Sequence, residues 1–201
     1  MLVIGLTGNL GTGKTEVARM LAELGAVAIN ADELGHELLQ PNTQTYTKII
    51  ETFGKSIVSR NREIDRKKLG QIAFSNAEAL NKLNRIMHPR IYNIVNHKID
   101  EFRQSGTAVV VLEAALLIEA GWKPLLDQLW VTTALESVIT KRLKKSRGLG
   151  EEQVIARLKT QMPQKEKIKQ ADVVIDTNVP IDELKAKVTE LWKNLRLTKK
   201  P

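Results

Sequence analysis

The stretch Gly8-Asn9-Leu10-Gly11-Thr12-Gly13-Lys14-Thr15 decides the fold of this chain. It matches the phosphate-binding loop (P-loop) pattern, in which a glycine and four residues precede Gly-Lys-Thr, and it lies between an apolar run at 2–7 and an amphipathic stretch at 16–24. Glycines let such a loop curve so that its backbone N–H groups point at phosphate oxygens, and the helix N-terminus adds unpaired donors. The sequence therefore predicts a site for a nucleoside triphosphate.

Each part of the loop has an expected role. Lys14 is expected to reach the β- and γ-phosphates, and the Thr15 hydroxyl is expected to ligate Mg²⁺. The alternative is a glycine-rich strand-to-helix turn with an incidental Lys-Thr, but the complete motif and its flanks favour the first interpretation. The residues predicted to bind ATP are Gly8, Asn9, Leu10, Gly11, Thr12, Gly13, Lys14, Thr15 and Glu16.

Composition limits the class of protein. A chain of 201 residues can bury a good core as one domain, and 42% hydrophobic with 27% charged residues is ordinary for a globular protein. There is no cysteine, which excludes disulfides and thiolate metal sites. No apolar run is long enough to span a bilayer and no signal peptide is evident, so we expect a cytoplasmic protein without a membrane partner.

The net charge of +8 has three interpretations: nucleic-acid binding, a polyanionic small substrate, or solvated helix faces. Only 4% of the residues are aromatic, which leaves few platforms for base stacking. The charge alone does not decide between these interpretations.

Apolar runs that resemble buried strands alternate with helical patterns along the chain. The expected strands are 2–7, 26–30, 108–112, 128–132 and 171–176, and the expected helices outside the middle of the chain are 14–24, 135–145 and 181–195. This alternation indicates a parallel sheet covered by helices on both faces. We therefore predict an α/β, three-layer P-loop fold with a five-stranded parallel sheet.

Two further regions complete the predicted organisation of a single domain. Residues 32–104 are too long for one crossover helix, and breaks at Pro41, Gly54, 59–62 and Pro89 predict an inserted helical region that binds the acceptor. Residues 144–150, with two glycines and three lysine or arginine residues including Arg147, predict an irregular, mobile lid segment. The predicted division is a core of 1–31, 105–140 and 171–197, an acceptor region of 32–104 and a lid region of 141–170; residues 198–201 are expected to be loose.

Two acids follow predicted strands. Asp32 comes two residues after the second strand and could act as the general base for an attacking hydroxyl, or it could cap a helix that begins at Glu33. Glu113 ends the third strand, where an acid holds Mg²⁺ directly or through water in P-loop proteins, although acids at strand ends are also common. Both interpretations stay open for each residue.

Cations and a His-Pro-Arg cluster are further candidates. Arg142 and Arg147 could stabilise charge on the γ-phosphate, or they could lie on a solvated helix face. Pro89 would suit the first turn of a helix that runs to Gln104, and proximity to that helix start would make His88 and Arg90 possible anion ligands.

With these residues in view, the chain resembles the dephospho-coenzyme A kinase family over nearly its whole length. The resemblance rests on the opening 4–15, Asp32, the segments 64–69 and 83–89, the run 116–121, the lid pattern of Arg142, Arg147, Arg157 and Gln161, and the segment 171–178. The chain departs from the family at Asn30, where an acid is common, at Glu113, which replaces a frequent Asp, and at Ala115, which replaces a frequent Pro.

The resemblance implies Mg²⁺-dependent transfer of the γ-phosphoryl group of ATP to the ribose 3′-hydroxyl of dephospho-coenzyme A. It implies that Asp32 acts on that hydroxyl, that Lys14, Arg142 and Arg147 act on ATP, and that Asn178 contacts the nucleotide. Thr15 and Glu113 are the implied metal ligands. The implied acceptor-binding residues are Asp65, Arg66, His88, Pro89, Arg90, Glu113 and Leu116. We expect no nucleic-acid partner, and we expect a monomer.

Other functions remain open. Another small-molecule or nucleoside kinase is the nearest, since a P-loop alone does not select the acceptor. A GTPase switch is suggested by the Asp-x-x-Gly pattern at 32–35, but the chain has no Asn-Lys-x-Asp guanine motif, and Asn81-Lys82-Leu83-Asn84 lacks the acid. A nucleic-acid-binding ATPase is suggested by the charge, and binding with a steep salt dependence would support it.

Overall fold

The computed structural model describes residues 1–148 and 150–195, without the side chain of Arg147. The chain forms two compact units. The first consists of Met1–Asn30 and the described residues from Lys98 onward, and the second is Ala31–His97. The division into core, acceptor region and lid stays a prediction, and the expected loose end at 198–201 lies outside the described residues.

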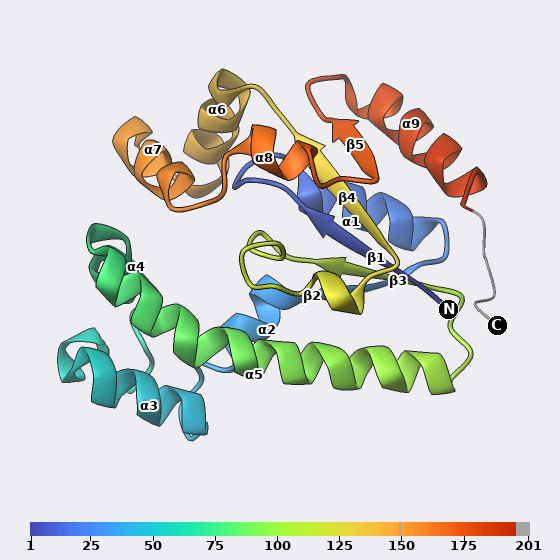
Figure 1. Ribbon diagram of the computed structural model, residues 1–201. Coiled ribbons are helices and arrows are strands. Elements are labelled where there is room, and N and C mark those ends of the chain that lie inside the picture. Colours follow the sequence, from blue (N-terminus) through green and yellow to red (C-terminus); the bar gives the residue numbers. More distant parts are fainter. Residues whose placement is uncertain (149, 196–201) are drawn as a thin grey trace. The chain divides into compact units, whose positions relative to one another are not determined.

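All five strands belong to the first unit and form one parallel sheet in the order β2-β3-β1-β4-β5 (Figure 1). Every residue of β1 and β3 is buried, whereas the edge strands β2 and β5 are only partly buried. Continuous burial of central strands is what a covered parallel sheet requires. The predicted fold is confirmed. The strands are β1 (Leu2–Thr7), β2 (Val27–Asn30), β3 (Val109–Glu113), β4 (Gln128–Thr133) and β5 (Val173–Asp176).

One face of the sheet is covered by α1 (Lys14–Glu23) and α9 (Ile181–Lys193), which pack against each other (Figure 1). Alternate residues of β1 and β3 enter this core because successive side chains of a strand point to opposite faces. The core includes Leu2, Ile4 and Leu6 of β1, Val17, Met20 and Leu21 of α1, Val109 and Val111 of β3, and Leu184 and Val188 of α9. This packing fixes the end of β1 against the start of α1, and so fixes the P-loop between them.

After β4 the chain forms α6 (Glu136–Arg147), α7 (Glu151–Lys159) and α8 (Gln164–Ile168), and a short 3₁₀ helix η2 (Lys123–Leu125) precedes β4. The predicted irregular segment at 144–150 is wrong in its first half, because residues 144–147 continue α6. Lysine and arginine are good helix formers, so the helix runs on until Gly148, whose left-handed backbone (φ 62°) ends it. Leu149 of that segment lies outside the described residues.

The second unit is helical, as predicted, and the breaks at Pro41, Gly54 and 59–62 are confirmed. Its elements are α2 (Ala31–Glu37), α3 (Gln44–Phe53), the 3₁₀ helix η1 (Lys55–Ile57), α4 (Arg66–Ser75) and α5 (Ala77–Gln104), the last of which ends in the first unit. Thr43 caps α3, since its hydroxyl accepts a hydrogen bond from the backbone N–H of Tyr46.

The predicted break at Pro89 is wrong, because α5 continues through it. Proline has no N–H to donate to the carbonyl of Arg85, and a proline inside a helix costs about 3 kcal/mol. The Arg90 guanidinium donates to the next carbonyl, that of Ile86, at 2.9 Å and not to that of Arg85. Burial of apolar side chains on the same helix offsets the cost of the proline. A stripe of apolar side chains four residues apart is buried on both sides of the proline: Met87, Ile91 and Val95.

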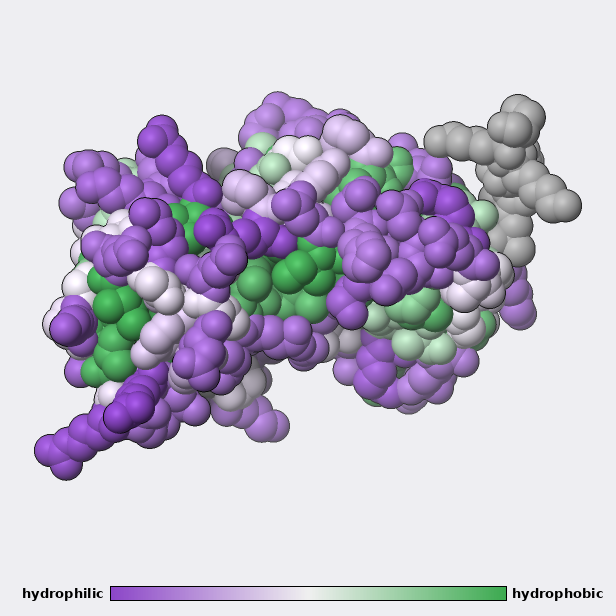
Figure 2. Space-filling view, turned by 90° about the horizontal axis from the view of Figure 1, so that it is seen from below, coloured by the Kyte–Doolittle hydropathy of each residue, from purple (hydrophilic) through white to green (hydrophobic). Residues whose placement is uncertain are grey.

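The surface seen in Figure 2 is mostly hydrophilic, with hydrophobic side chains confined to smaller areas. Among the described residues, no helix combines the length and the apolar character that crossing a membrane requires.

Candidate active site

The P-loop has the backbone that its glycines predict. Gly8 has a φ of +152° and Gly13, which precedes α1, has a φ of +81°. A Cβ atom on Gly8 would lie 2.3 Å from the Thr132 hydroxyl oxygen and 2.5 Å from the Thr132 carbonyl oxygen, far inside van der Waals contact. Glycine is therefore required at position 8 for two reasons, namely backbone conformation and the close approach of β4.

Hydrogen bonds among buried threonine side chains and backbone carbonyls stabilise the P-loop. The Thr12 hydroxyl oxygen lies 2.8 Å from the Asn9 carbonyl oxygen and 2.8 Å from the Thr132 hydroxyl oxygen, which in turn lies 3.2 Å from the Thr7 carbonyl oxygen. The Thr177 hydroxyl oxygen, after β5, lies 3.0 Å from the Thr12 carbonyl oxygen. All four threonines are buried. These contacts join the ends of β1, β4 and β5 to the P-loop and restrict its shape.

The Lys14 ammonium is turned into the loop. Its Nζ donates to the Gly8 carbonyl at 3.0 Å and to the Asn9 carbonyl at 3.3 Å, and the residue is 7% exposed. A lysine in this position is ready to exchange loop carbonyls for phosphate oxygens. Among the described residues, Asn9 Oδ1 is buried and has no hydrogen-bond partner, so it is an acceptor that only a donor could satisfy.

The two predicted metal ligands are brought together. The Thr15 hydroxyl donates to Glu113 Oε1 at 2.5 Å, and Glu113 is 4% exposed. Glu113 is the last residue of β3, in register with Leu6 of β1 and with Asn30 of β2. A hydroxyl and a carboxylate side by side fit Mg²⁺, which is commonly bound through one or two protein ligands together with substrate phosphates. Within residues 1–148 and 150–195 there is no cluster of three His, Cys, Asp or Glu side chains that could hold a metal.

Arg142 of α6 lies next to the P-loop. Its guanidinium donates to the Gly11 carbonyl at 3.4 Å, to the Thr177 hydroxyl at 3.0 Å and to the Thr177 carbonyl at 2.6 Å. Nearby, Asn178 Oδ1 accepts a hydrogen bond from the Leu135 backbone N–H at 2.9 Å. Arg142 and Asn178 therefore connect the loop after β5 to α6 and, through Arg142, to the P-loop.

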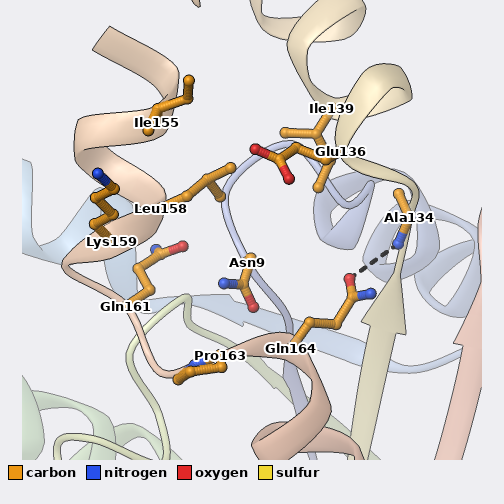
Figure 3. Close-up of a pocket in the computed structure, with 10 residues that line it drawn as sticks. All are labelled: Asn9, Ala134, Glu136, Ile139, Ile155, Leu158, Lys159, Gln161, Pro163 and Gln164. Atoms are coloured by element: carbon orange, nitrogen blue, oxygen red, sulfur yellow. Dashed lines mark hydrogen bonds between the residues drawn. The ribbon is translucent and has the colours of Figure 1, made fainter. Parts of the chain in front are cut away.

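A pocket of about 540 Å³ opens beside the P-loop (Figure 3). Figure 3 shows Asn9 in the middle of the lining residues, with side chains of α6, α7 and the α7–α8 segment around it. Its lining combines apolar and polar side chains: Ala134, Glu136, Ile139, Ile155, Leu158, Lys159, Gln161, Pro163 and Gln164. This pocket could not be predicted from the sequence, because its lining comes from the P-loop, from the residue after β4, from α6 and α7 and from the segment 161–164, whose mutual packing is not visible in a local pattern.

Residues 161–164, between α7 and the start of α8, form hydrogen bonds with the P-loop and with the residue after β4. Gln161 Oε1 accepts a hydrogen bond from the Leu10 backbone N–H at 2.9 Å, and Asn9 Nδ2 donates to the Met162 carbonyl at 3.2 Å. Gln164 Oε1 accepts from the Ala134 backbone N–H at 3.1 Å (Figure 3). Only the family resemblance indicated Gln161 as a candidate residue, and its hydrogen bond with the P-loop was not predicted.

The remaining candidates include residues of the second unit. Asp32 lies in the first turn of α2, which begins at Ala31, so the alternative that Asp32 caps a helix beginning at Glu33 is wrong. Asp65 caps α4: its Oδ1 accepts hydrogen bonds from the backbone N–H groups of Lys67 at 3.0 Å and Lys68 at 3.2 Å. Arg66 is the first residue of that helix and is exposed.

His88 and Arg90 lie in the middle of α5, so the helix start that was to make them anion ligands is absent there. The Arg90 guanidinium instead donates to the carbonyl of Ile86. Leu116 lies half-buried in the turn after β3. The side chain of Arg147 is outside what the structure describes.

The chain is similar in sequence to known dephospho-CoA kinases. The sequence model of the family described as dephospho-CoA kinase matches residues 2–183. The dephospho-CoA kinase of Dehalococcoides mccartyi is 42% identical over 193 residues, which cover 96% of this chain and 97% of the relative, and that of Geobacter sulfurreducens is 40% identical over 192 residues, 96% and 98%.

Solved structures give the same result. The dephospho-CoA kinase from Campylobacter jejuni superposes with a TM-score of 0.68 at 27% identity, covering 95% of each chain. A shikimate kinase from Bacteroides thetaiotaomicron, with a TM-score of 0.54 at 16% identity over 96% and 98% of the two chains, shares the fold alone. The near full-length match shows that the chain belongs to the dephospho-CoA kinase family.

Proposed function

We propose that the chain transfers the γ-phosphoryl group of ATP to the ribose 3′-hydroxyl of dephospho-coenzyme A, giving coenzyme A and ADP in the last step of coenzyme A synthesis. One observation of the structure supports the phosphoryl-transfer chemistry most strongly: an intact P-loop whose Thr15 hydroxyl meets the buried Glu113 carboxylate at the end of β3. The acceptor is inferred from the family to which the chain belongs.

The P-loop would bind the triphosphate through its backbone N–H groups, and Lys14 would leave the Gly8 carbonyl for the β- and γ-phosphate oxygens. Thr15 and Glu113 would hold Mg²⁺, which when bound neutralises charge on those oxygens. Arg142, which is hydrogen-bonded to the P-loop carbonyl of Gly11, would contact the nucleotide together with Asn178. The positive charge of Arg147 would stabilise the negative charge on the transferred phosphoryl group.

Asp32 is proposed as the residue that orients the acceptor hydroxyl and accepts its proton. It follows Asn30, the residue in register with Glu113, by two positions along the chain. The carboxyl ends of parallel strands are where open α/β sheets bind their ligands, which supports a chemical role for an acid at this point of the chain.

The family resemblance supports contacts with the acceptor for seven residues: Asp65, Arg66, His88, Pro89, Arg90, Glu113 and Leu116. The net charge of +8 suits two polyphosphate ligands rather than a nucleic acid. A monomeric, cytoplasmic enzyme is part of the same proposal.

The test is ADP release measured with MgATP and four acceptor conditions: dephospho-coenzyme A, adenosine, nucleoside monophosphates and no acceptor. The proposal expects turnover to depend on dephospho-coenzyme A, and it expects Lys14→Met to abolish it. Turnover with a nucleoside monophosphate but not with dephospho-coenzyme A would instead support another nucleotide kinase.

A further inference from the structure

Lys167 of α8 is a lysine with no solvent exposure. Its ammonium lies 2.8 Å from the Ala115 carbonyl oxygen and within 3.0 Å of both carboxylate oxygens of Glu119. Although Glu119 as a residue is exposed, its side chain is only 20% exposed, so the ion pair is largely removed from water. A buried ammonium is unfavourable unless its donors are paired, and this one meets three acceptor atoms.

The ion pair extends toward the P-loop in one direction. Glu119 Oε1 also accepts a hydrogen bond from the Met162 backbone N–H at 2.9 Å. The carbonyl of Met162 accepts from Asn9 Nδ2, and the neighbouring Gln161 accepts from the Leu10 backbone N–H. Lys167 therefore positions the Glu119 carboxylate, and this carboxylate fixes residues 161 and 162. These two residues in turn contact Asn9 and Leu10 of the P-loop.

The ion pair extends toward the strand ends in the other direction. The Ala115 carbonyl accepts from Lys167 and lies 3.4 Å from the Thr7 hydroxyl, its second donor. Ala115 follows Glu113 by two residues, and Thr7 directly precedes Gly8. One buried ammonium is thus connected to the segment after the proposed metal ligand and to the P-loop.

We propose that Lys167, acting through Glu119 and Gln161, is a positioning residue for phosphoryl transfer, and this inference rests on the proposed function. The Leu10 N–H donates to Gln161 and the Asn9 side chain donates to Met162, so protein contacts fix the second and third residues of the P-loop. The α- and β-phosphates are expected at the backbone N–H groups of the Gly-Lys-Thr end of the loop. Loss of the ion pair should therefore disturb the γ-phosphoryl group more than the diphosphate. A misplacement of about 1 Å can lower a rate about a hundredfold.

The first test is the neutral double variant Lys167→Met with Glu119→Gln, which removes the ammonium that holds the side chain at position 119 against the Met162 N–H and leaves no unpaired buried charge. Replacement of a buried ion pair by neutral residues commonly preserves folding. We expect kcat to fall about 10- to 100-fold. Affinity for MgADP, measured by calorimetry, should change less than about threefold, because the amides that hold the diphosphate are untouched.

A matched control is the exposed ion pair between Lys169 and Glu166, which lies at the same helix with an Nζ–Oε1 distance of 2.7 Å. Neutralising it by Lys169→Met with Glu166→Gln should leave kcat unchanged, since exposed pairs contribute little. A folded Lys167→Met, Glu119→Gln variant with the kcat of the unmodified protein would overturn the proposal.

The second test uses Gln161→Leu, which removes the acceptor of the Leu10 N–H without touching the ion pair. We expect a similar loss of kcat, and no further loss when Gln161→Leu is combined with the neutral double variant, because groups in one network are not additive. Fully additive losses would show that Lys167 does not act through Gln161.

If the neutral double variant fails to fold, Gln161→Leu decides alone, and an unchanged kcat would contradict the proposal. The two hypotheses fail in different ways. Absence of turnover with dephospho-coenzyme A in the unmodified protein counts against the proposed function. Normal turnover in both the unmodified and the Gln161→Leu protein counts against the positioning role only.

Discussion

Replacing Thr15 with valine removes one hydroxyl and keeps the β-branched shape of the side chain. In the structure this hydroxyl donates to Glu113 Oε1 at 2.5 Å, and Glu113 is 4% exposed. A hydrogen bond to a charged group contributes about 1.5–3 kcal/mol. Thr15 itself is exposed, so water can partly replace the hydroxyl and the loss should be near 2 kcal/mol. For a chain of this length, that corresponds to a melting temperature lower by about 4–8 °C.

The effect on turnover should be larger than the effect on stability. The same hydroxyl is a proposed Mg²⁺ ligand, so Thr15→Val should lower kcat/KM about a hundredfold, or about 2.7 kcal/mol of transition-state stabilisation. The Mg²⁺ concentration that gives half-maximal rate should rise as well. Thr15→Ser is the matched control, because serine keeps the hydroxyl and should retain most of the activity.

The assay is dephospho-coenzyme A-dependent ADP release at a series of Mg²⁺ concentrations, with thermal unfolding followed in the absence of nucleotide and metal. The valine and serine variants are compared at the same protein concentration. An unchanged Mg²⁺ requirement in Thr15→Val would refute the assignment of Thr15 as a metal ligand, whatever happened to its melting temperature.

Three further substitutions test other parts of the site. Asp32→Asn should lower kcat by about a hundredfold while MgATP affinity, measured by calorimetry, stays nearly constant, and an unaltered kcat would remove this residue from the chemistry. Gly8→Ala places a Cβ 2.3 Å from the Thr132 hydroxyl and should destabilise the protein by about 1–3 kcal/mol in denaturant unfolding, whereas Gly150→Ala, where a Cβ meets open space, should have little effect. Asp65→Asn keeps a good helix cap, so stability should change by only a few tenths of a kcal/mol; if KM for dephospho-coenzyme A also stays the same, the residue caps α4 and does nothing more.

The strands and the P-loop could be predicted from the sequence because their signals are local. The run at 2–7 is the observed β1, and Glu113 ends β3 as expected. Continuous apolar runs between helical patterns leave few alternatives to a parallel sheet. The meeting of Thr15 and Glu113 could be anticipated for the same reason, since Glu113 ends β3 and Thr15 ends the P-loop that follows the adjacent parallel strand β1.

Two errors in the helix predictions have different physical causes. Pro89 usually ends a helix, but the buried apolar stripe that includes Met87 and Ile91 continues past it, and α5 does so too. The basic residues at 144–147 suggested a mobile loop by charge, whereas their helix propensity extends α6 to Gly148.

Some features of the site had no readable signal. Lys167 lies in the lysine-rich segment 165–169, whose charge suggests a solvated helix face. Its buried ammonium is paired with Glu119, which is 48 positions away in the sequence. Thr132 and Thr177 belong to no recognisable motif, yet their hydroxyls hydrogen-bond to Thr12 of the P-loop. Such contacts depend on how distant segments pack, and one sequence carries no record of that packing.

The most direct test of the central claim is the position of the transferred phosphate. The purified protein is incubated with MgATP and dephospho-coenzyme A, and the product is examined by phosphorus NMR and mass spectrometry. The account predicts one new phosphate monoester on the ribose 3′-oxygen, formed in equal amount to ADP. Phosphate on any other oxygen, or ADP formed together with free phosphate and an unmodified acceptor, would contradict it.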